Sequence, residues 1–214
     1  MQESTDSVAD LVHERLRDAI LSAELRPNYR LVEEDLAAWL QVSRTPVREA
    51  LLRLRQEGLV VRAKGWLVRD HAPKEILQII QARAAIESAT AHLAAQCITT
   101  EDLARLEELV DRMEDPGSSR VEINELNNRF HAIITDASGN FLLTQFHRRT
   151  KINYWNYNTP VVFTPADDEL VNREHRELIA ALRAGDSELS ERIAREHVGH
   201  TARILSAAFG IETG

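Results

Sequence analysis

Residues 42–60, which read VSRTPVREALLRLRQEGLV, decide the fold of the N-terminal part of the chain. Ser43 is a residue type that caps helix starts, and Pro46 suits a first turn, where its missing N–H costs no hydrogen bond. Apolar residues then recur at the spacing of one helix face: Val47, Ala50, Leu51 and Leu54. Gly58 supplies a helix stop. The stretch predicts an amphipathic helix from Ser43 to about Glu57.

The sequence on either side of this helix predicts a small mixed domain. Before it, apolar spacing predicts a helix over 8–22 and a shorter one over 33–40. After it, residues 59–62 and 66–69 predict two strands of a hairpin, with a turn at 63–65. Three short helices followed by a β-hairpin form a winged helix-turn-helix, whose third helix can enter the DNA major groove.

The start of the third helix carries side chains suited to DNA. Arginine offers a planar fork that matches guanine O6 and N7, while serine and threonine can bond phosphates or bases. In the turn of the wing, glycine permits close backbone approach and lysine supplies charge to a phosphate or the minor groove. The predicted DNA contacts are Ser43, Arg44, Thr45, Pro46, Arg48, Lys64 and Gly65. A solvated helix face with no DNA partner is the alternative interpretation.

Charge is unevenly distributed along the 214 residues. The net charge of −8 and the pI of about 5.5 argue, for the whole chain, against a nucleic-acid binder. Residues 44–69, however, hold seven basic and two acidic residues, which gives +5. We therefore expect this basic window to face DNA and the acidic surplus to lie mainly in the C-terminal part.

Cys97 is the single cysteine of the chain. It excludes an intramolecular disulfide and a cysteine-rich zinc site, and its apolar neighbours predict a buried, unreactive thiol. The N-terminus has no signal-like segment, and no apolar run approaches the ~18 residues that a membrane span needs. We expect a cytoplasmic protein without a membrane partner.

The remainder of the chain is predicted to be helical. Helices are expected over 74–96, 100–114, 119–137, 140–157, 166–184 and 187–208. The predicted fold class is mainly α: a winged helix-turn-helix over 1–71 and an all-α antiparallel bundle over 72–214.

Residues 42–51, 53–54 and 57–60 closely resemble the DNA-binding domain of GntR-family transcription regulators, and Leu31, Glu33, Leu36 and Ala37 fit the same pattern. The resemblance implies a homodimer that reads a palindromic operator in double-stranded DNA, one half-site per winged unit. Some relatives place a DNA-contacting arginine on the second helix, where this chain has the acids 33–35. We therefore do not expect phosphate contact from that helix.

Residues 72–214 resemble the FCD (FadR C-terminal domain) effector-binding subfamily. The resemblance rests on short motifs: Arg83-Ala84-Ala85-Ile86-Glu87, Phe130-His131, Ala137-Ser138-Gly139-Asn140, Glu174-His175, Gly185-Asp186 and Glu196-His197. It implies that Arg83 binds a small-molecule carboxylate effector. The alternative is that Arg83 forms a surface ion pair with Glu87, four residues later on the same helix.

The same resemblance implies a metal site of three histidines and one acid. The matching positions are Asn127, His131, His175 and His197, and the metal is a divalent ion, zinc first, with nickel, copper or iron as alternatives. Asn127 stands where the pattern has aspartate, and an amide brings no charge. We expect weaker metal retention and a positive field that favours an anionic effector. His200 could compete with His197, whereas His13, His71, His92 and His147 are expected to be ordinary hydrogen-bonded histidines.

These patterns together indicate a ligand-responsive transcription regulator, expected to be a repressor and not an enzyme. Two alternatives remain open. The bundle could be a structural dimerisation module without an effector, or, less favoured, the three histidines could serve a metal-dependent hydrolase.

Overall fold

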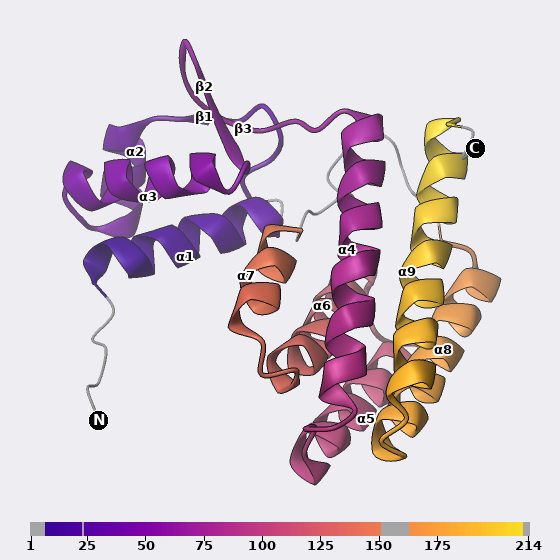
Figure 1. Ribbon diagram of the computed structural model, residues 1–214. Helices are drawn as coiled ribbons and strands as arrows, with labels where there is room; N and C mark the ends of the chain where they lie inside the picture. The colour runs from indigo at the N-terminus through magenta and orange to yellow at the C-terminus, as the bar shows by residue number, and fades with distance from the viewer. Residues whose placement is uncertain (1–6, 23, 151–162, 212–214) are drawn as a thin grey trace. The chain divides into compact units, whose positions relative to one another are not determined.

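The computed structural model describes residues 7–22, 24–150 and 163–211. The described residues form two compact units, one comprising residues up to Ala72 and the other the residues from Pro73 onward. Figure 1 shows the order of the helices and strands along the chain.

The N-terminal unit contains α1 (Val8–Leu21), α2 (Glu33–Leu40) and α3 (Arg44–Gln56). Ser43 has the extended backbone of an N-cap residue, although its side chain makes no capping hydrogen bond. Gly58 has a φ of +80°, and its N–H and that of Leu59 bond the carbonyls of Arg55 and Leu54. This pattern ends the helix with a left-handed residue, which glycine adopts without steric cost. The predicted third helix is confirmed.

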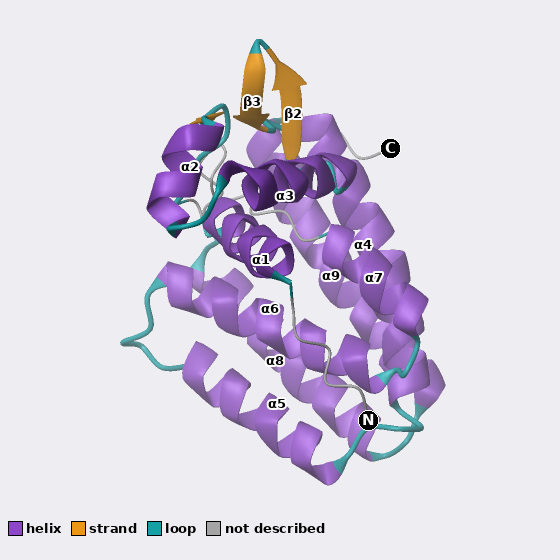
Figure 2. Cartoon of the chain, turned by 90° about the vertical axis from the view of Figure 1, so that its left-hand side faces the viewer, coloured by secondary structure: helices purple, strands orange, loops and turns teal. Residues whose placement is uncertain are grey.

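A three-stranded antiparallel sheet completes this unit, with β1 (Arg30–Leu31), β2 (Val60–Ala63) and β3 (Gly65–Val68) in the order β1-β3-β2. Ala63 pairs with Gly65, which leaves Lys64 at the tip of the hairpin. Figure 2 shows β2 and β3 as a projecting ribbon. The predicted hairpin is confirmed, whereas β1 was not predicted.

One apolar core holds the N-terminal unit together. It joins the inner faces of α1, α2 and α3 to the sheet, and it includes Val12, Leu16, Leu36, Val47, Ala50, Leu51, Leu54, Val60, Trp66 and Val68. The apolar stripe predicted for α3 is therefore its buried face, and the opposite face carries the arginines.

The C-terminal unit is entirely helical. It consists of α4 (Pro73–Ala94), α5 (Thr100–Met113), α6 (Arg120–Ala137), α7 (Phe141–Arg149), α8 (Pro165–Arg183) and α9 (Ser187–Phe209). Side chains of Thr99, Ser119, Asn140, Thr164 and Asp186 cap the starts of the last five. The long helices α4 and α9 run antiparallel, side by side (Figure 1). Positions 151–157 of the helix predicted over 140–157 lie outside the described residues.

The core of this unit is built from aliphatic side chains and Phe130, which is fully buried. Cys97 lies in the turn after α4 and is exposed, so the prediction of a buried thiol was wrong. Helix α4 ends at Ala94, three residues before the cysteine. Within the described part of the chain, no helix is long and apolar enough to cross a membrane.

Candidate DNA-binding face and metal centre

The first turns of α3 present two arginines to solvent. The side chains of Arg44 and Arg48 are 55% and 57% exposed, whereas Val47 between them is fully buried. They lie four residues apart, and positions with that spacing share one helix face. The helix therefore displays two guanidinium groups on one side and packs its apolar stripe against the core.

Both arginines are paired with the acids at the start of α2, a contact that the sequence did not predict. Arg48 donates from Nε and Nη2 to the carboxylate of Glu33, at 3.2 and 2.8 Å to Oε2. Arg44 Nη1 lies 2.7 Å from Glu34 Oε1, and its Nη2 lies 3.5 Å from Glu33 Oε2. The hydrogen bond from Arg48 lowers the pKa of Glu33. The basic window is thus partly neutralised by carboxylates nearby.

The other predicted DNA contacts lie where the sequence pattern put them. Ser43 and Thr45 are exposed at the start of α3, Pro46 is half-buried in its first turn, and Lys64 is exposed at the hairpin tip. Gly65 has a φ of +133°, a conformation that side chains rarely adopt. These residues form the candidate DNA-binding face together with Arg44 and Arg48.

Three of the predicted metal ligands meet in the interior of the C-terminal unit. His131 of α6, His175 of α8 and His197 of α9 are at most 4% exposed, and one nitrogen of each lies within 4.8 Å of the others. The Nε2 atoms of His131 and His197 are 3.2 Å apart. Burial lowers the pKa of His131 to about 4 and that of His175 well below its ordinary value. Neutral imidazoles keep the lone pairs that a metal ion needs.

Two buried polar groups fit a bound cation. Among the described residues, neither ring nitrogen of His175 has a hydrogen-bond partner, and the Oδ1 atom of Asn127 is also buried without one. Buried polar atoms are normally satisfied, so each unpartnered atom calls for an explanation. Imidazole nitrogen and amide oxygen are both metal ligands, so a coordinated cation is an explanation for each of these unpartnered atoms.

Two buried carboxylates contact the Nδ1 atoms of two of the histidines. Glu87 Oε2 lies 3.0 Å from His131 Nδ1, and Glu174 Oε2 lies 3.0 Å from His197 Nδ1. A carboxylate at Nδ1 fixes the ring orientation and leaves Nε2 for a metal. His200 also contacts Glu174 and is not part of the three-histidine cluster. This arrangement favours His197 over His200 as the ligand.

Arg83 lies next to this cluster through Glu87. Its Nε donates to Glu87 Oε1 at 2.5 Å, so the alternative pair exists, but both side chains are buried and do not form a surface pair. Glu87 Oε1 also bonds His147 Nε2 at 2.9 Å. Burial alone would raise the pKa of Glu87, and the Arg83 charge with the two histidines outweighs it and holds that pKa well below the usual range.

These contacts change the charge expected around a metal. With Asn127 as a neutral ligand, the sequence suggested no compensating charge at all. Glu87, Glu174 and Arg83 add two negative charges and one positive, a net −1 beside the histidines. A divalent ion would then leave about +1, which suits one carboxylate anion.

Sequence reasoning therefore missed the contacts that Glu87 and Glu174 make with the site. Glu87 and Glu174 stood within the family motifs, but their contacts join different helices, α4 with α6 and α8 with α9, and no spacing rule reveals them. His147 was expected to be an ordinary hydrogen-bonded histidine, and it is buried and bonded to Glu87.

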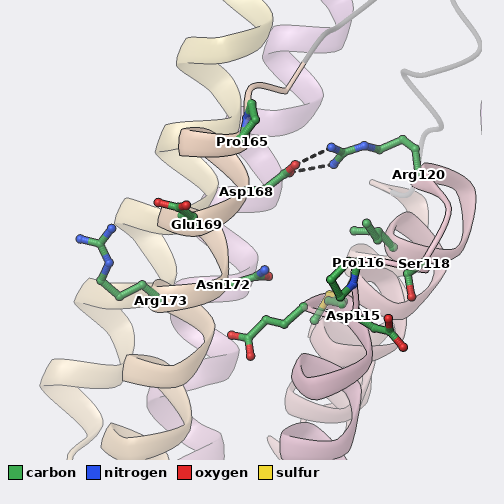
Figure 3. A pocket seen from close by; sticks show the side chains of 12 residues that line it. Asp115, Pro116, Ser118, Arg120, Pro165, Asp168, Glu169, Asn172 and Arg173 are labelled. Carbon is green, nitrogen blue, oxygen red and sulfur yellow. Dashed lines mark hydrogen bonds and ion pairs between the residues drawn. The ribbon is translucent and has the colours of Figure 1, made fainter.

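A separate open hollow lies between the end of α5, the start of α6 and the first turns of α8. It has a volume of about 910 Å³. Arg120 spans its edge with a bidentate pair to Asp168, at 2.8 and 2.6 Å, as Figure 3 shows. None of the predicted DNA, metal or effector residues lines this hollow.

Comparisons with known proteins agree with both units. Residues 9–66 match the family described as bacterial regulatory proteins, gntR family, and residues 78–200 match the FCD domain. The chain is 29% identical over 220 residues to the Uxu operon transcriptional regulator of Escherichia coli (strain K12), which covers 89% of this chain and 83% of that protein. It is 26% identical over 198 residues to the HTH-type transcriptional repressor RspR of the same organism, covering 91% and 87%. The solved structure of E. coli McbR/YncC matches with a TM-score of 0.83 and 25% identity, covering 95% of this chain and 99% of that one.

The FCD match alone spans more than half of the chain, and the winged unit that precedes it has the fold and the exposed helix face of a DNA reader. The predicted fold class is confirmed. The chain belongs to the GntR family of bacterial transcriptional regulators and carries an FCD domain at its C-terminal side.

Proposed function

We propose that this GntR-family regulator is a homodimeric, metal-containing repressor that releases its operator when a small carboxylate binds the C-terminal unit. The name of the relative RspR supports repression. The families and relatives are regulators, which supports a regulatory rather than an enzymatic role. A cytoplasmic location belongs to the same proposal.

The DNA contacts are assigned to the exposed face of α3 and the wing. Arg44 and Arg48 approach guanine edges in the major groove, because Arg forks pair with O6 and N7. Ser43, Thr45 and the backbone at Pro46 lie beside them, and Lys64 with Gly65 contacts a phosphate or the minor groove. Two such units in a dimer read a palindromic duplex, so affinity depends on their spacing.

The metal ligands are assigned to His131, His175, His197 and Asn127. The observation that carries this assignment is the fully buried His175, whose two ring nitrogens have no hydrogen-bond partner among the described residues. When bound, zinc or a related divalent ion supplies a Lewis-acid position that accepts a carboxylate oxygen. Glu87 and Glu174 hold His131 and His197 in the orientation that this needs.

Arg83 is assigned to the effector. Its guanidinium lies beside the cluster through Glu87, and a carboxylate that binds the metal would gain a second anchor from it. Arg83 and Glu87 belong to α4, the helix that begins directly after the DNA-binding unit. A rearrangement at this pair is therefore a route by which effector binding changes the placement of the two DNA-reading units.

The proposal is tested by adding acetate, lactate, succinate or benzoate to the zinc-loaded full-length protein. Binding to a duplex that the wild-type protein selects from a randomised library is measured by fluorescence anisotropy, together with the melting temperature. We expect at least one carboxylate to raise the melting temperature and weaken DNA binding, since a ligand of the native state stabilises it.

His175→Ala and Arg83→Gln should abolish both effects. His92→Ala is the control, because this half-exposed histidine pairs with Glu191 on the surface of the bundle. If no carboxylate changes either quantity, the effector proposal fails and the structural dimerisation module becomes the better account.

A further inference from the structure

The acids at the start of α2 contact the two arginines of α3 through different nitrogen atoms. The Glu33 carboxylate accepts hydrogen bonds from Nε and Nη2 of Arg48, and none of these bonds involves Nη1. Glu34 forms an ion pair with the terminal Nη1 of Arg44, and Glu33 lies near Nη2 of the same arginine. Because a fork meets guanine O6 and N7 with two N–H groups on one edge, these two contacts have different consequences for base recognition.

The Glu33 carboxylate is itself fixed in place. Its side chain is only 12% exposed, and the Nε1–H of Trp66 in β3 donates to Oε1 at 3.3 Å. Trp66 is buried, and Arg62 stacks on its ring with a centroid distance of 4.8 Å. Glu33 therefore links α2, the wing and Arg48. Because this carboxylate already restricts the rotamers of Arg48, the arginine loses less conformational freedom when its other edge binds a base.

Glu34 has none of this support. Its side chain is 57% exposed, and its Oε1 pairs with the terminal Nη1 of Arg44. Nη1 is one of the two terminal nitrogens of the guanidinium, so an Arg44 that meets a base with its terminal edge has to give up this contact. The same carboxylate also brings negative charge toward the phosphates.

We propose that the two neighbouring carboxylates have opposite effects on DNA recognition: Glu33 positions Arg48 for base contact, whereas Glu34 competes with DNA for Arg44. This inference rests on the proposed DNA contacts of Arg44 and Arg48. Glu33 is a positioning residue that acts through Arg48, and Glu34 is an internal competitor that sets a lower affinity.

Three isosteric substitutions remove the same charge from adjacent positions. Glu33→Gln and Glu34→Gln are compared with Asp35→Asn, because Asp35 is exposed beside them and has no ion pair or hydrogen bond with either arginine among the described contacts. Full-length protein is titrated with the wild-type-selected duplex and with a random-sequence duplex of equal length. The ratio of the two affinities measures base recognition, since loss of one acidic charge affects both duplexes alike.

Glu33→Gln should lower this ratio about three- to tenfold, the effect of releasing one immobilised long side chain. Glu34→Gln should raise affinity for the selected duplex about two- to fivefold and by more than Asp35→Asn does, since one exposed competing pair is lost. An unchanged ratio for Glu33→Gln, or equal gains for Glu34→Gln and Asp35→Asn, would overturn the inference.

A double-mutant cycle separates positioning from a general structural role. If Glu33 acts through Arg48, Glu33→Gln combined with Arg48→Ala should have the same ratio as Arg48→Ala alone, whereas independent effects would add. Arg48→Ala and Arg44→Ala also test the underlying function. If they leave the ratio at the wild-type value, the proposed DNA contacts fail; if they lower it while Glu33→Gln does not, only the positioning role fails.

Discussion

Glu174→Gln is the substitution that tests most sharply how the buried carboxylates support the histidines. Glu174 is 7% exposed, and its Oε2 lies 3.0 Å from His197 Nδ1. Glutamine keeps the shape and one acceptor oxygen but removes the negative charge. His197 then loses the charged partner that favours Nε2 as the metal-binding atom.

The expected loss is in metal affinity. Removing a carboxylate behind a ligating histidine costs about 10- to 100-fold. We expect the lower part of this range, about 10- to 30-fold or roughly 1.4 to 2 kcal/mol, because glutamine still offers an acceptor and Glu87 still supports His131. Zinc affinity is measured by competition with a chromogenic chelator, on protein whose helical content matches the wild type by circular dichroism.

Two controls make the result specific. Glu177 lies three residues further along α8 on the exposed side, and Glu177→Gln should keep a zinc affinity within about twofold of the wild type. His200→Ala removes the other partner of Glu174 and should also bind zinc nearly as the wild type does. If Glu174→Gln binds zinc within twofold of the wild type while His197→Ala does not bind it, the orienting role of Glu174 is refuted.

Three further predictions concern stability and reactivity. The hydrogen bond between His13 and Glu57, at 2.6 Å, raises the pKa of His13 despite burial. The contribution of this pair to the free energy of unfolding is therefore complete below the unfolded pKa of about 6.5, and it is lost as the pH rises through the raised pKa of the folded state. Denaturant unfolding from about pH 6 to pH 9 should show this loss in the wild type and not in His13→Gln; parallel curves would contradict it. Leu51→Ala should destabilise the N-terminal unit by about 2 to 5 kcal/mol, because Leu51 is fully buried, whereas Leu52→Ala, at a position 40% exposed, should cost far less; equal hydrogen exchange of the α3 amides in both variants would count against this. Cys97 is exposed and should react with a thiol reagent in the folded protein, and reaction only after denaturation would show the opposite.

The elements whose signals are local could be predicted from the sequence. The N-cap of α3 at Ser43, the left-handed Gly58 just after the helix and the hairpin around Lys64 each depend on a few adjacent residues with definite backbone preferences. By contrast, β1 has only two residues, Arg30 and Leu31, too few to show an alternating pattern. It exists because it pairs with β3, which no local signal encodes.

The candidate sites divide in the same way. His131, His175 and His197 were found from their place in a family pattern, and the structure brings them together. The contacts of the carboxylates that support them could not be found in this way, since Glu87 of α4 reaches His131 of α6 and Glu174 of α8 reaches His197 of α9 only in the folded bundle. The pairing of the α3 arginines with Glu33 and Glu34 is likewise tertiary, and it makes the candidate DNA-binding face less basic than the residue count over 44–69 suggested.

Metal content tests the central claim most directly, because the proposed effector site depends on it. The full-length protein is purified without a chelator or a nickel resin, and its divalent metal is quantified by mass spectrometry. We expect metal to co-purify at a fixed stoichiometry with the wild type and to be absent from His175→Ala, with zinc as the ion most often bound. A wild-type protein that carries no metal and takes up none from zinc-containing buffer would contradict the account.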